Sequence, residues 1–507
     1  MLMPNLLRAR PRRRAHAPFA LALACASIAS LAPAVSTAAG LYFSDRGVRA
    51  TGRGGAFVAG ADDLGALWYN PAGLAFAGDS VLADASYLRF GSTYQRETLV
   101  HDPNTGKGVI LGSDYYPMVR GTSPLLPLPT LAISNNFGLK NWNFAVGVMA
   151  PYSALTSYPE QQLQFNGSTV APPQRYSLIT LDGSALTVVG AYASYMPTDR
   201  IAFGAGLEAL IGTFASRLAF SACPPANFVC ANEDPNYDAT AQLNVGPIVA
   251  PSGNAGMIAI LQDTPESEVR LGAMVQLPFW VNSPAKIDIQ LPSAPIFQNA
   301  SVEGNQANVK FRLPAIARLG LESRFGPKKR TRVEAAFVYE AWSMQDSISI
   351  TPTGNGIQMH GIAAFPDPYP VGPMAQQRGF RDTFSVHGGV EHSFDAGGYP
   401  MMVRGGLSYE RSAVPPEYLS VLTVDLDKVQ AALGSSLYVG ERKNLRLDIV
   451  YAHTFAFSQE VNPADAQIQK LPVVRATPPN PDQQVAINGG RYTAQADVIG
   501  VGLNWLY

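Results

Sequence analysis

The fold is decided by the last nine residues of the chain, which read IGVGLNWLY at positions 499–507. Successive side chains of a β-strand point to opposite faces, so this stretch has one large apolar face and one small or polar face. The apolar face consists of Ile499, Val501, Leu503, Trp505 and Tyr507, and the other face holds Gly500, Gly502 and Asn504. A lipid-facing apolar row with small or polar residues opposite is what a strand of a membrane β-barrel requires.

Four earlier stretches show the same alternation, but one face of each also carries charged side chains. These charges are Arg270, Arg312, Arg318, Glu322, Arg324, Glu334, Glu340, Arg446 and Asp448. A charge on the lipid face near the membrane midplane costs roughly 2–4 kcal/mol. In a membrane barrel these side chains must therefore point into the lumen. A soluble β-sandwich would show the same alternation with its apolar row inside, so alternation alone does not separate the two classes.

The lengths of the connections between the strands distinguish the membrane barrel from the soluble sandwich. We predict strands over residues 80–90, 128–137, 142–150, 184–197, 200–220, 253–262, 268–289, 309–325, 331–350, 381–394, 400–411, 432–440, 445–457 and 491–507. Tight links, at 138–141, 197–199, 326–329, 395–398 and 441–444, alternate with long ones at 91–127, 151–183, 221–252, 290–308, 351–380, 412–431 and 458–490. An even strand count with short periplasmic turns and long outer loops is typical of bacterial outer-membrane proteins. The sequence thus predicts an all-β fold, a transmembrane antiparallel β-barrel of about 14 strands over 80–507.

The N-terminus predicts export. Five arginines between Arg8 and Arg14 precede an apolar stretch from Phe19 to Val35, and small residues follow at 37–39. This three-part layout is typical of a secretory signal peptide, here residues 1–39. We expect the exported protein to lie in the outer membrane of a Gram-negative bacterium, which it would cross many times as a β-barrel.

Charge and cysteine content limit the partners. Of 37 basic and 38 acidic residues, five arginines lie in the leader, which leaves 32 basic and 38 acidic residues, a net charge of −6. This balance offers no basic face for nucleic acid. Two cysteines follow the leader, Cys223 and Cys230, and an oxidising periplasm allows a loop disulfide between them. Their spacing fits no zinc site, and we expect no metal or cofactor.

Residues 40–79 do not alternate and need another explanation. They include a glycine-rich run at 47–56, then Asp62-Asp63 and the turn signature Asn70-Pro71-Ala72-Gly73. The run lacks the Lys-Ser/Thr ending and the preceding strand of a phosphate-binding loop. Glycine and alanine allow close packing against a wall, so we predict that residues 40–79 form a hatch, a compact plug inside the lumen.

This segment resembles the N-terminal hatch of the FadL family of long-chain fatty acid transporters, which includes toluene and xylene channels. The matching residues are Gly54, Gly55, Ala56, Ala59, Asp62, Asp63, Asn70, Pro71, Ala72 and Gly73. Looser matches are Ala150-Pro151-Tyr152 through Tyr158-Pro159, which resembles the segment after the kinked third strand, and residues 339–343. Ser153 stands where relatives often have glycine, which leaves the shape of that outer loop open.

The resemblance implies uptake of hydrophobic small molecules, either fatty acids or hydrocarbons. A solute would be captured between outer loops, pass to a pocket against the hatch, and leave sideways at the strand-three kink. Hatch and gate residues would be Asp62, Asp63, Asn70, Pro71, Ala72 and Gly73. Further expected partners are outer-membrane lipid, lipopolysaccharide and the barrel assembly machinery, which reads a terminal aromatic strand. We expect a monomer, since a closed barrel with its own plug needs no partner for stability.

Pocket residues are predicted from chemistry. Tyr152, Leu155, Leu163 and Phe165 either line an entry groove or serve ordinary loop packing. Arg312 and Arg318 are expected to face the lumen, where they would hold a carboxylate head group. The alternative is that both pair with lumen acids such as Glu334 or Glu340.

Two other functions compete with uptake. A lipid hydrolase needs a nucleophile with a positioned base, and none of the five histidines after the leader sits in a recognisable Ser/His arrangement in the sequence. We therefore expect no enzymatic activity. A general porin needs an open aqueous path, which a forty-residue hatch would block.

Overall fold

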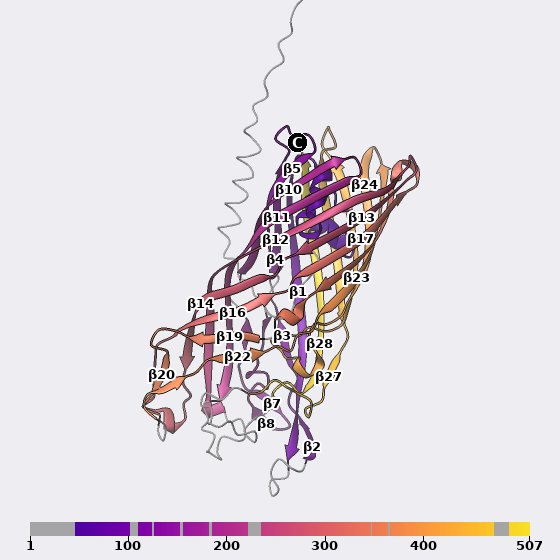
Figure 1. Cartoon of the computed structure of the whole chain (residues 1–507). Coiled ribbons are helices and arrows are strands. Elements are labelled where there is room, and N and C mark those ends of the chain that lie inside the picture. Colours follow the sequence, from indigo (N-terminus) through magenta and orange to yellow (C-terminus); the bar gives the residue numbers. More distant parts are fainter. Residues whose placement is uncertain are drawn as a thin grey trace, which may run out of the picture. The chain divides into compact units, whose positions relative to one another are not determined.

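The computed structural model describes residues 46–101, 110–123, 126–152, 156–181, 185–221, 235–345, 347–362, 366–470 and 486–507 (Figure 1). The predicted signal peptide at 1–39, Leu155, and the cysteines Cys223 and Cys230 lie outside these residues. No helix in the described ranges has the length and hydropathy to cross a membrane.

Fourteen antiparallel strands of the described chain form the wall of one closed barrel, as the sequence predicts. They are β1 (Ser80–His101), β3 and β4 (Val119–Thr122, Leu126–Asn135), β5 (Trp142–Met149), β10 (Ala185–Thr198), β11 (Ile201–Ser221), β12 (Asp238–Asp263), β13 and β14 (Ser267–Gln276, Phe279–Gln290), β16 and β17 (Gln306–Leu313, Ile316–Phe325), β18 and β19 (Thr331–Glu340, Ser347–Pro352), β22 and β23 (Met374–Gln377, Thr383–Ala396), β24 (Tyr399–Glu410), β25 (Lys428–Val439), β26 (Leu445–Ala456) and β28 (Gly490–Leu506). Each pairs with its neighbour along the chain, and β28 pairs with both β26 and β1. This last pairing closes the barrel and leaves no free edge.

The remaining elements are short, and most of them lie in the connections between the wall strands. The strands are β2 (Ile110–Tyr115), β6 (Thr156–Ser157), β7 (Leu163–Phe165), β8 (Ser168–Val170), β9 (Thr180–Leu181), β15 (Ser301–Glu303), β20 (Ile357–His360), β21 (Tyr369–Val371) and β27 (Gln459–Val461). The 3-10 helices are η4 (Pro235–Tyr237), η5 (Pro295–Phe297), η6 (Pro327–Lys329), η7 (Trp342–Met344) and η8 (Pro416–Tyr418). Short turns gather at the end of the barrel where the C-terminus lies, and the long connections gather at the other end (Figure 1). By that asymmetry the C-terminal end is periplasmic.

Several strands are longer than predicted. β1 continues to His101, not residue 90, and β12 begins at Asp238, so half of the predicted loop 221–252 is strand. The wall extends past the apolar band, where outward residues such as Asn244 are exposed and polar. Outside the lipid an outward face has no need to be apolar, so the alternation that marks a membrane strand disappears there.

Two predicted strands are interrupted within the wall. The side chains that face inward on β14 are odd-numbered, from Phe279 to Ile287, whereas those on β13 are even-numbered, from Glu268 to Gln276. The same change separates β16 from β17 at Pro314 and Ala315. Each break moves the inward face by one residue, because side chains alternate with a period of two.

Inside the barrel, the segment from Arg46 to Ala77 is almost entirely buried, which confirms the predicted plug. It contains the short helices α2 (Val48–Gly52), α3 (Ala66–Tyr69), η1 (Pro71–Gly73) and α4 (Leu74–Ala77), drawn in indigo in the periplasmic half of the barrel (Figure 1). Helix α2 lies against β24, β25, β26 and β28, and η1 lies against β10, β11 and β12. The hatch therefore contacts opposite sides of the wall.

The lumen itself has two chemically different halves. Along one continuous part of the wall, the inward residues of β16 are Ala307, Val309, Phe311 and Leu313, whereas those of β17 include Arg318, Glu322 and Arg324. Residues of β14 and β13 change in the same way, from Phe279, Val281 and Ile287 to Gln276, Arg270 and Glu268. Along this part of the wall the outer half is apolar and the periplasmic half is charged. The hatch occupies the charged half and ends at the boundary.

Candidate functional site: the hatch and the lumen above it

Inward-facing glycines of the wall make room for the hatch. A Cβ atom built on any of six of them would lie 2.1–2.8 Å from a hatch atom, closer than real contacts allow. These glycines are Gly204, Gly256, Gly272, Gly320, Gly389 and Gly406, each on a different strand. The hatch backbone thus packs directly against the backbone of the wall, an approach that only glycine permits.

Two arginines of the hatch form ion pairs with carboxylates of the wall. Arg49 donates to Glu391 at 2.7 Å, and Arg53, with no exposed surface, donates to Glu322 at 2.7 Å and to Glu334 at 2.9 Å. Both guanidinium groups also lie 5.3 Å from the ring centre of Phe57. A buried charge is tolerated only when it is paired, so hatch and wall neutralise each other in this half of the lumen.

Lumen side chains also hold the hatch by its backbone. The Glu334 carboxylate accepts hydrogen bonds from the N–H groups of Val58 at 2.6 Å, Ala59 at 2.8 Å and Gly60 at 3.1 Å. From the wall, Asn143 donates to the Leu74 carbonyl at 2.8 Å, Asn254 to Leu67 at 3.0 Å, and Arg318 to Trp68 at 2.8 Å. Each bond satisfies a buried backbone group that the irregular hatch leaves without a helical partner.

The predicted gate residue Asn70 ties the hatch to itself and to the wall. Its amide donates to the Val58 carbonyl and to the Met257 carbonyl of β12, both at 3.0 Å, and its oxygen accepts from Ala72 N–H at 3.2 Å. Pro71, Ala72 and Gly73 form η1 directly after it. These residues are brought together against β10, β11 and β12.

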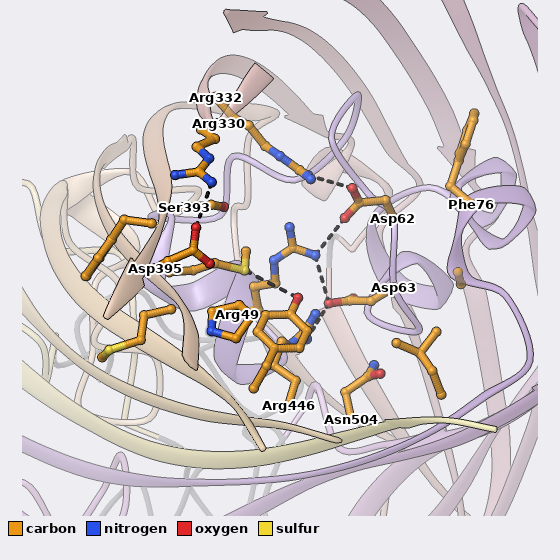
Figure 2. Close-up of a pocket in the computed structure, with 17 residues that line it drawn as sticks. Arg49, Asp62, Asp63, Phe76, Arg330, Arg332, Ser393, Asp395, Arg446 and Asn504 are labelled. Atoms are coloured by element: carbon orange, nitrogen blue, oxygen red, sulfur yellow. Dashed lines mark hydrogen bonds and ion pairs between the residues drawn. The ribbon is translucent and has the colours of Figure 1, made fainter. Parts of the chain in front are cut away.

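The predicted gate residues Asp62 and Asp63 face a polar cavity of about 390 Å³ at the periplasmic mouth (Figure 2). Asp62 accepts from Arg49 at 2.6 Å and from Arg332 at 2.5 Å, and Asp63 accepts from Arg446 at 2.7 Å. Burial by itself raises the pKa of both carboxyl groups. The neighbouring guanidinium groups outweigh burial and hold the pKa of Asp62 well below its usual range, and that of Asp63 below it.

Above the hatch, aromatic rings begin the apolar half of the lumen. The ring of Trp68 on α3 lies 6.4 Å from that of Tyr152, and Tyr152 lies 6.0 Å from Phe279, both edge to face. Arg318 stacks on Trp68 at 5.1 Å. Tyr152, predicted for the pocket, is therefore buried at the boundary between the hatch and the apolar chamber.

An outer loop folds inward and fills this chamber. Five buried apolar side chains between β24 and β25 join the core, namely Val414, Leu419, Val421, Val424 and Leu426. Tyr492 of β28 stacks on Tyr94 at 4.5 Å and donates to the Leu419 carbonyl at 3.3 Å. We call residues 413–424 the inward loop. Beside it lies a void of about 20 Å³, enough for a single water molecule, which is lined by Trp342, Phe380 and Val414 and by the acids Glu340, Glu410 and Asp425.

The third strand of the barrel leaves the hydrogen-bonded ladder beside the chamber. β5 ends at Met149, which pairs with Thr130 and Val188, and pairing resumes at Thr156 and Ser157 in β6. Between them, Arg46 at the start of the described hatch donates to the Pro151 carbonyl. The sequence motif at 150–152 thus marks a break in the wall that the hatch contacts.

Two predictions about the pocket need correction. Arg312 does not face the lumen: it is exposed on the outside of β16 and stacks on Trp280 at 4.9 Å. The break after Leu313 shifts the inward face by one residue, so Arg312 and Arg318 point to opposite sides of the wall. Arg318 does face the lumen, but it binds the hatch carbonyl of Trp68, and Glu334 pairs with Arg53. The predicted pairing of these two arginines with Glu334 is not formed.

The other predicted pocket residues are less central. Leu163 and Phe165 are half-buried on β7, which forms a small hairpin with β8, and Leu163 packs against the main apolar core. Arg49, Arg53 and Glu391 were not predicted from the sequence, although a pair of arginines inside a glycine-rich segment that must be buried is a signal for the first two. Ser385 and His387 were not predicted either, and their side chains meet at 2.8 Å. The other His387 nitrogen bonds the Gly54 carbonyl at 2.7 Å, so this pair anchors the hatch.

Comparison with known proteins gives a consistent result. The family model described as outer membrane protein transport protein (OMPP1/FadL/TodX) matches residues 28–505. A crystal structure of a Pseudomonas aeruginosa FadL homologue is similar with a TM-score of 0.62 and 14% identity, and the P. putida toluene transporter TodX with 0.55 and 15%. The Ralstonia pickettii toluene transporter TbuX gives 0.51 and 15%. In each case the match covers 92% of this chain and 99% of the other. No curated protein sequence matches the chain.

Proposed function

Because the chain belongs to the OMPP1/FadL/TodX family of outer membrane transport proteins, we propose that it takes up small hydrophobic molecules through the apolar chamber and releases them sideways at the strand-three break. As a member of that family it is a transport channel of the Gram-negative outer membrane and not an enzyme. The proposal of an apolar chamber and a lateral exit rests on one observation. Along β14 and β16 the lumen is apolar in its extracellular half, and a bound hatch closes it on the periplasmic side.

The chamber suits a hydrophobic solute for a simple energetic reason. Each CH₂ group moved from water into an apolar site contributes about 0.8 kcal/mol. The side chains around the chamber, among them Phe279, Val281 and Leu186, are almost completely buried and belong to the same apolar core as Trp68. A bound solute would replace the apolar side chains of the inward loop, because the chamber is filled when the loop is in place.

The exit follows from what lies below the chamber. Straight passage to the periplasm would take an apolar solute through the ion pairs of Arg49 and Arg53, where it would break charged contacts without replacing them. The break between Met149 and Thr156 offers a route into lipid that avoids them. Tyr152 and Pro151, which contact Trp68 and Arg46, would move when the hatch moves.

The substrate is a long-chain fatty acid or a hydrocarbon. TodX and TbuX are toluene transporters, and another solved structure of this fold is the CymD monoaromatic hydrocarbon channel. Detergent-purified protein should therefore be exposed to a mixture of long-chain fatty acids, alkanes and monoaromatics and examined by native mass spectrometry. We expect one class to be retained, and retained more weakly by Phe279→Ala than by Phe337→Ala, whose ring faces lipid.

The lateral exit has its own test. Met149 pairs with Thr130 and Ser157 with Thr122, so the two strands are equally long across the break. A six-residue replacement of 150–155 by alternating Thr and Val would therefore fit the ladder without insertion or deletion. We expect this variant to retain the solute in detergent but to lose most of its uptake in cells. Pro251→Val, in a paired part of β12, is the control for losing a proline. Unchanged uptake in the closed variant would exclude the lateral route.

A further inference from the structure

The outside of the barrel changes from apolar to polar along β14 and β16. Leu277 and Trp280 are 58% and 60% exposed and belong to the lipid-facing band, as do Leu319 and Leu321 on the neighbouring β17. Beyond Trp280, most outward positions of β12, β14 and β16 are polar, among them Thr240, Gln242, Asn244, Asn282, Lys286, Asp288, Gln306, Asn308 and Lys310. Trp280 therefore marks the outer boundary of the hydrocarbon layer, where aromatic residues gather.

Three cations lie at that boundary or further out, on two paired strands. Arg312 is opposite Trp280 in the ladder, Lys310 is opposite Asn282, and Lys286 is four residues further out on β14 than Asn282. All three are exposed, and the Arg312 guanidinium lies over the Trp280 ring at 4.9 Å. We call Lys286, Lys310 and Arg312 the rim patch.

Among the described residues, the rim patch makes no ion pair. Asp288 is the acid on the same outward face, and it accepts a hydrogen bond from Asn305 at 3.2 Å. Some exposed charges elsewhere on the wall are paired, such as His453 with Asp497 at 2.8 Å and Arg217 with Glu160 at 3.0 Å. The rim patch is therefore a net positive surface that begins at the Trp280 level and extends outward along β14 and β16 on one side of the barrel.

We propose that the rim patch binds the phosphate groups of lipid A in the outer leaflet. At the boundary of that leaflet the phosphates provide the anions, and Lys and Arg bind phosphate by charge-assisted hydrogen bonds. Trp280 would pack against the adjoining acyl chains while Arg312 stays stacked on its ring. The lipid would then fix the tilt and depth of this side of the barrel. The proposal is independent of the transported solute.

The test compares two triple variants that remove the same charge. Lys286→Gln/Lys310→Gln/Arg312→Gln removes the rim patch, and Lys140→Gln/Lys328→Gln/Arg442→Gln removes exposed cations from the periplasmic turns. Each full-length protein is purified in detergent, titrated with bisphosphorylated lipid A, and examined by native mass spectrometry. Since each cation near an anionic surface contributes a factor of roughly five, we expect binding to the rim variant to be at least about tenfold weaker.

Two further arms identify the source of the anion. Dephosphorylated lipid A should bind the wild type as weakly as it binds the rim variant, and millimolar inorganic phosphate should not displace lipid A, because it lacks the acyl chains that meet Trp280. Equal lipid A binding by the wild type and the rim variant would overturn the proposal. So would an equal loss in the periplasmic control, since general charge would then explain the binding. Displacement by inorganic phosphate would show an adventitious anion site only.

Discussion

A single carboxylate, that of Glu334, holds three consecutive hatch N–H groups and the Arg53 guanidinium. Glu334→Ala leaves the three buried N–H groups without this acceptor and leaves Arg53 paired with Glu322 alone, and a buried donor that loses its partner costs about 1–3 kcal/mol. We expect the free energy of hatch opening to fall by about that amount, measured by hydrogen exchange of residues 53–63. Glu441→Ala, in an exposed periplasmic turn, is the control and should leave exchange unchanged. Unaltered exchange in Glu334→Ala would show that the hatch does not depend on this group.

Asp62 makes hatch docking depend on pH in a defined direction. Its pKa is depressed in the folded protein, so its ionised form stabilises docking above the ordinary Asp pKa of about 4, and this stabilisation is lost as pH falls through the lower, folded pKa. The difference in hatch opening between wild type and Asp62→Asn should therefore be the same at pH 7 and pH 5 and shrink only below about pH 4. Hydrogen exchange across this range measures it. A difference that already shrinks between pH 7 and 5 would contradict the assignment.

At the scale of elements, the wall strands carry glycine where the hatch touches them. β23 offers a matched pair, because Gly389 faces the hatch and Gly388 faces lipid. A Cβ atom on Gly389 would lie 2.5 Å from the Arg53 carbonyl oxygen, whereas a Cβ atom on Gly388 would lie in open space. We expect Gly389→Val to expose the hatch to limited proteolysis in a folded, heat-resistant barrel, and Gly388→Val to behave as wild type. Equal protection in both would show that the hatch has room to shift.

Strand interruptions act at the same scale, by choosing which side chains enter the lumen. The breaks at Pro278 and Pro314 reverse the inward parity of β14 and β16, which places Phe279 and Phe311 inside and Arg312 outside. Without these breaks the outer half of the lumen would receive Trp280 and Arg312. The apolar chamber and the rim patch thus depend on the same local departure from regular alternation.

In the whole molecule the lumen is closed at two levels, by the hatch in the periplasmic half and by the inward loop in the extracellular half. Deleting the hatch at 46–78 should therefore give only small conductance in a planar bilayer, because packed apolar side chains still exclude ions. Deleting residues 413–424 as well, bridged by one glycine, should give large steady steps. The bridge is feasible because Ser412 and Asp425 are joined by a 2.8 Å hydrogen bond. Large steps from the hatch deletion alone would show that the inward loop is no barrier.

Local patterns in the sequence are enough to predict the class of fold and the presence of a plug before residue 80. Alternation in 499–507, the regular succession of short and long links, and the glycine-rich segment before residue 80 are local signals that each follow from a single physical requirement. Lipid demands an apolar outward face, closure demands an even antiparallel order, and a narrow lumen demands small residues. Boundaries were less well predicted where the wall leaves the membrane, because those requirements no longer act there.

Two features depend on the folded barrel: which charged side chains form ion pairs, and whether each side chain of the wall points to the lumen or to the lipid. Arg49 and Glu391 are 342 residues apart, and no spacing in the sequence relates them. Arg312 and Arg318 have the same parity, yet a break between them sends one outward and the other to Trp68. Even or odd numbering predicts the inward face only while a strand is unbroken. Ion-pair partners across the lumen depend on how the whole wall closes. Neither the breaks nor the closure can be read from the alternation of residues.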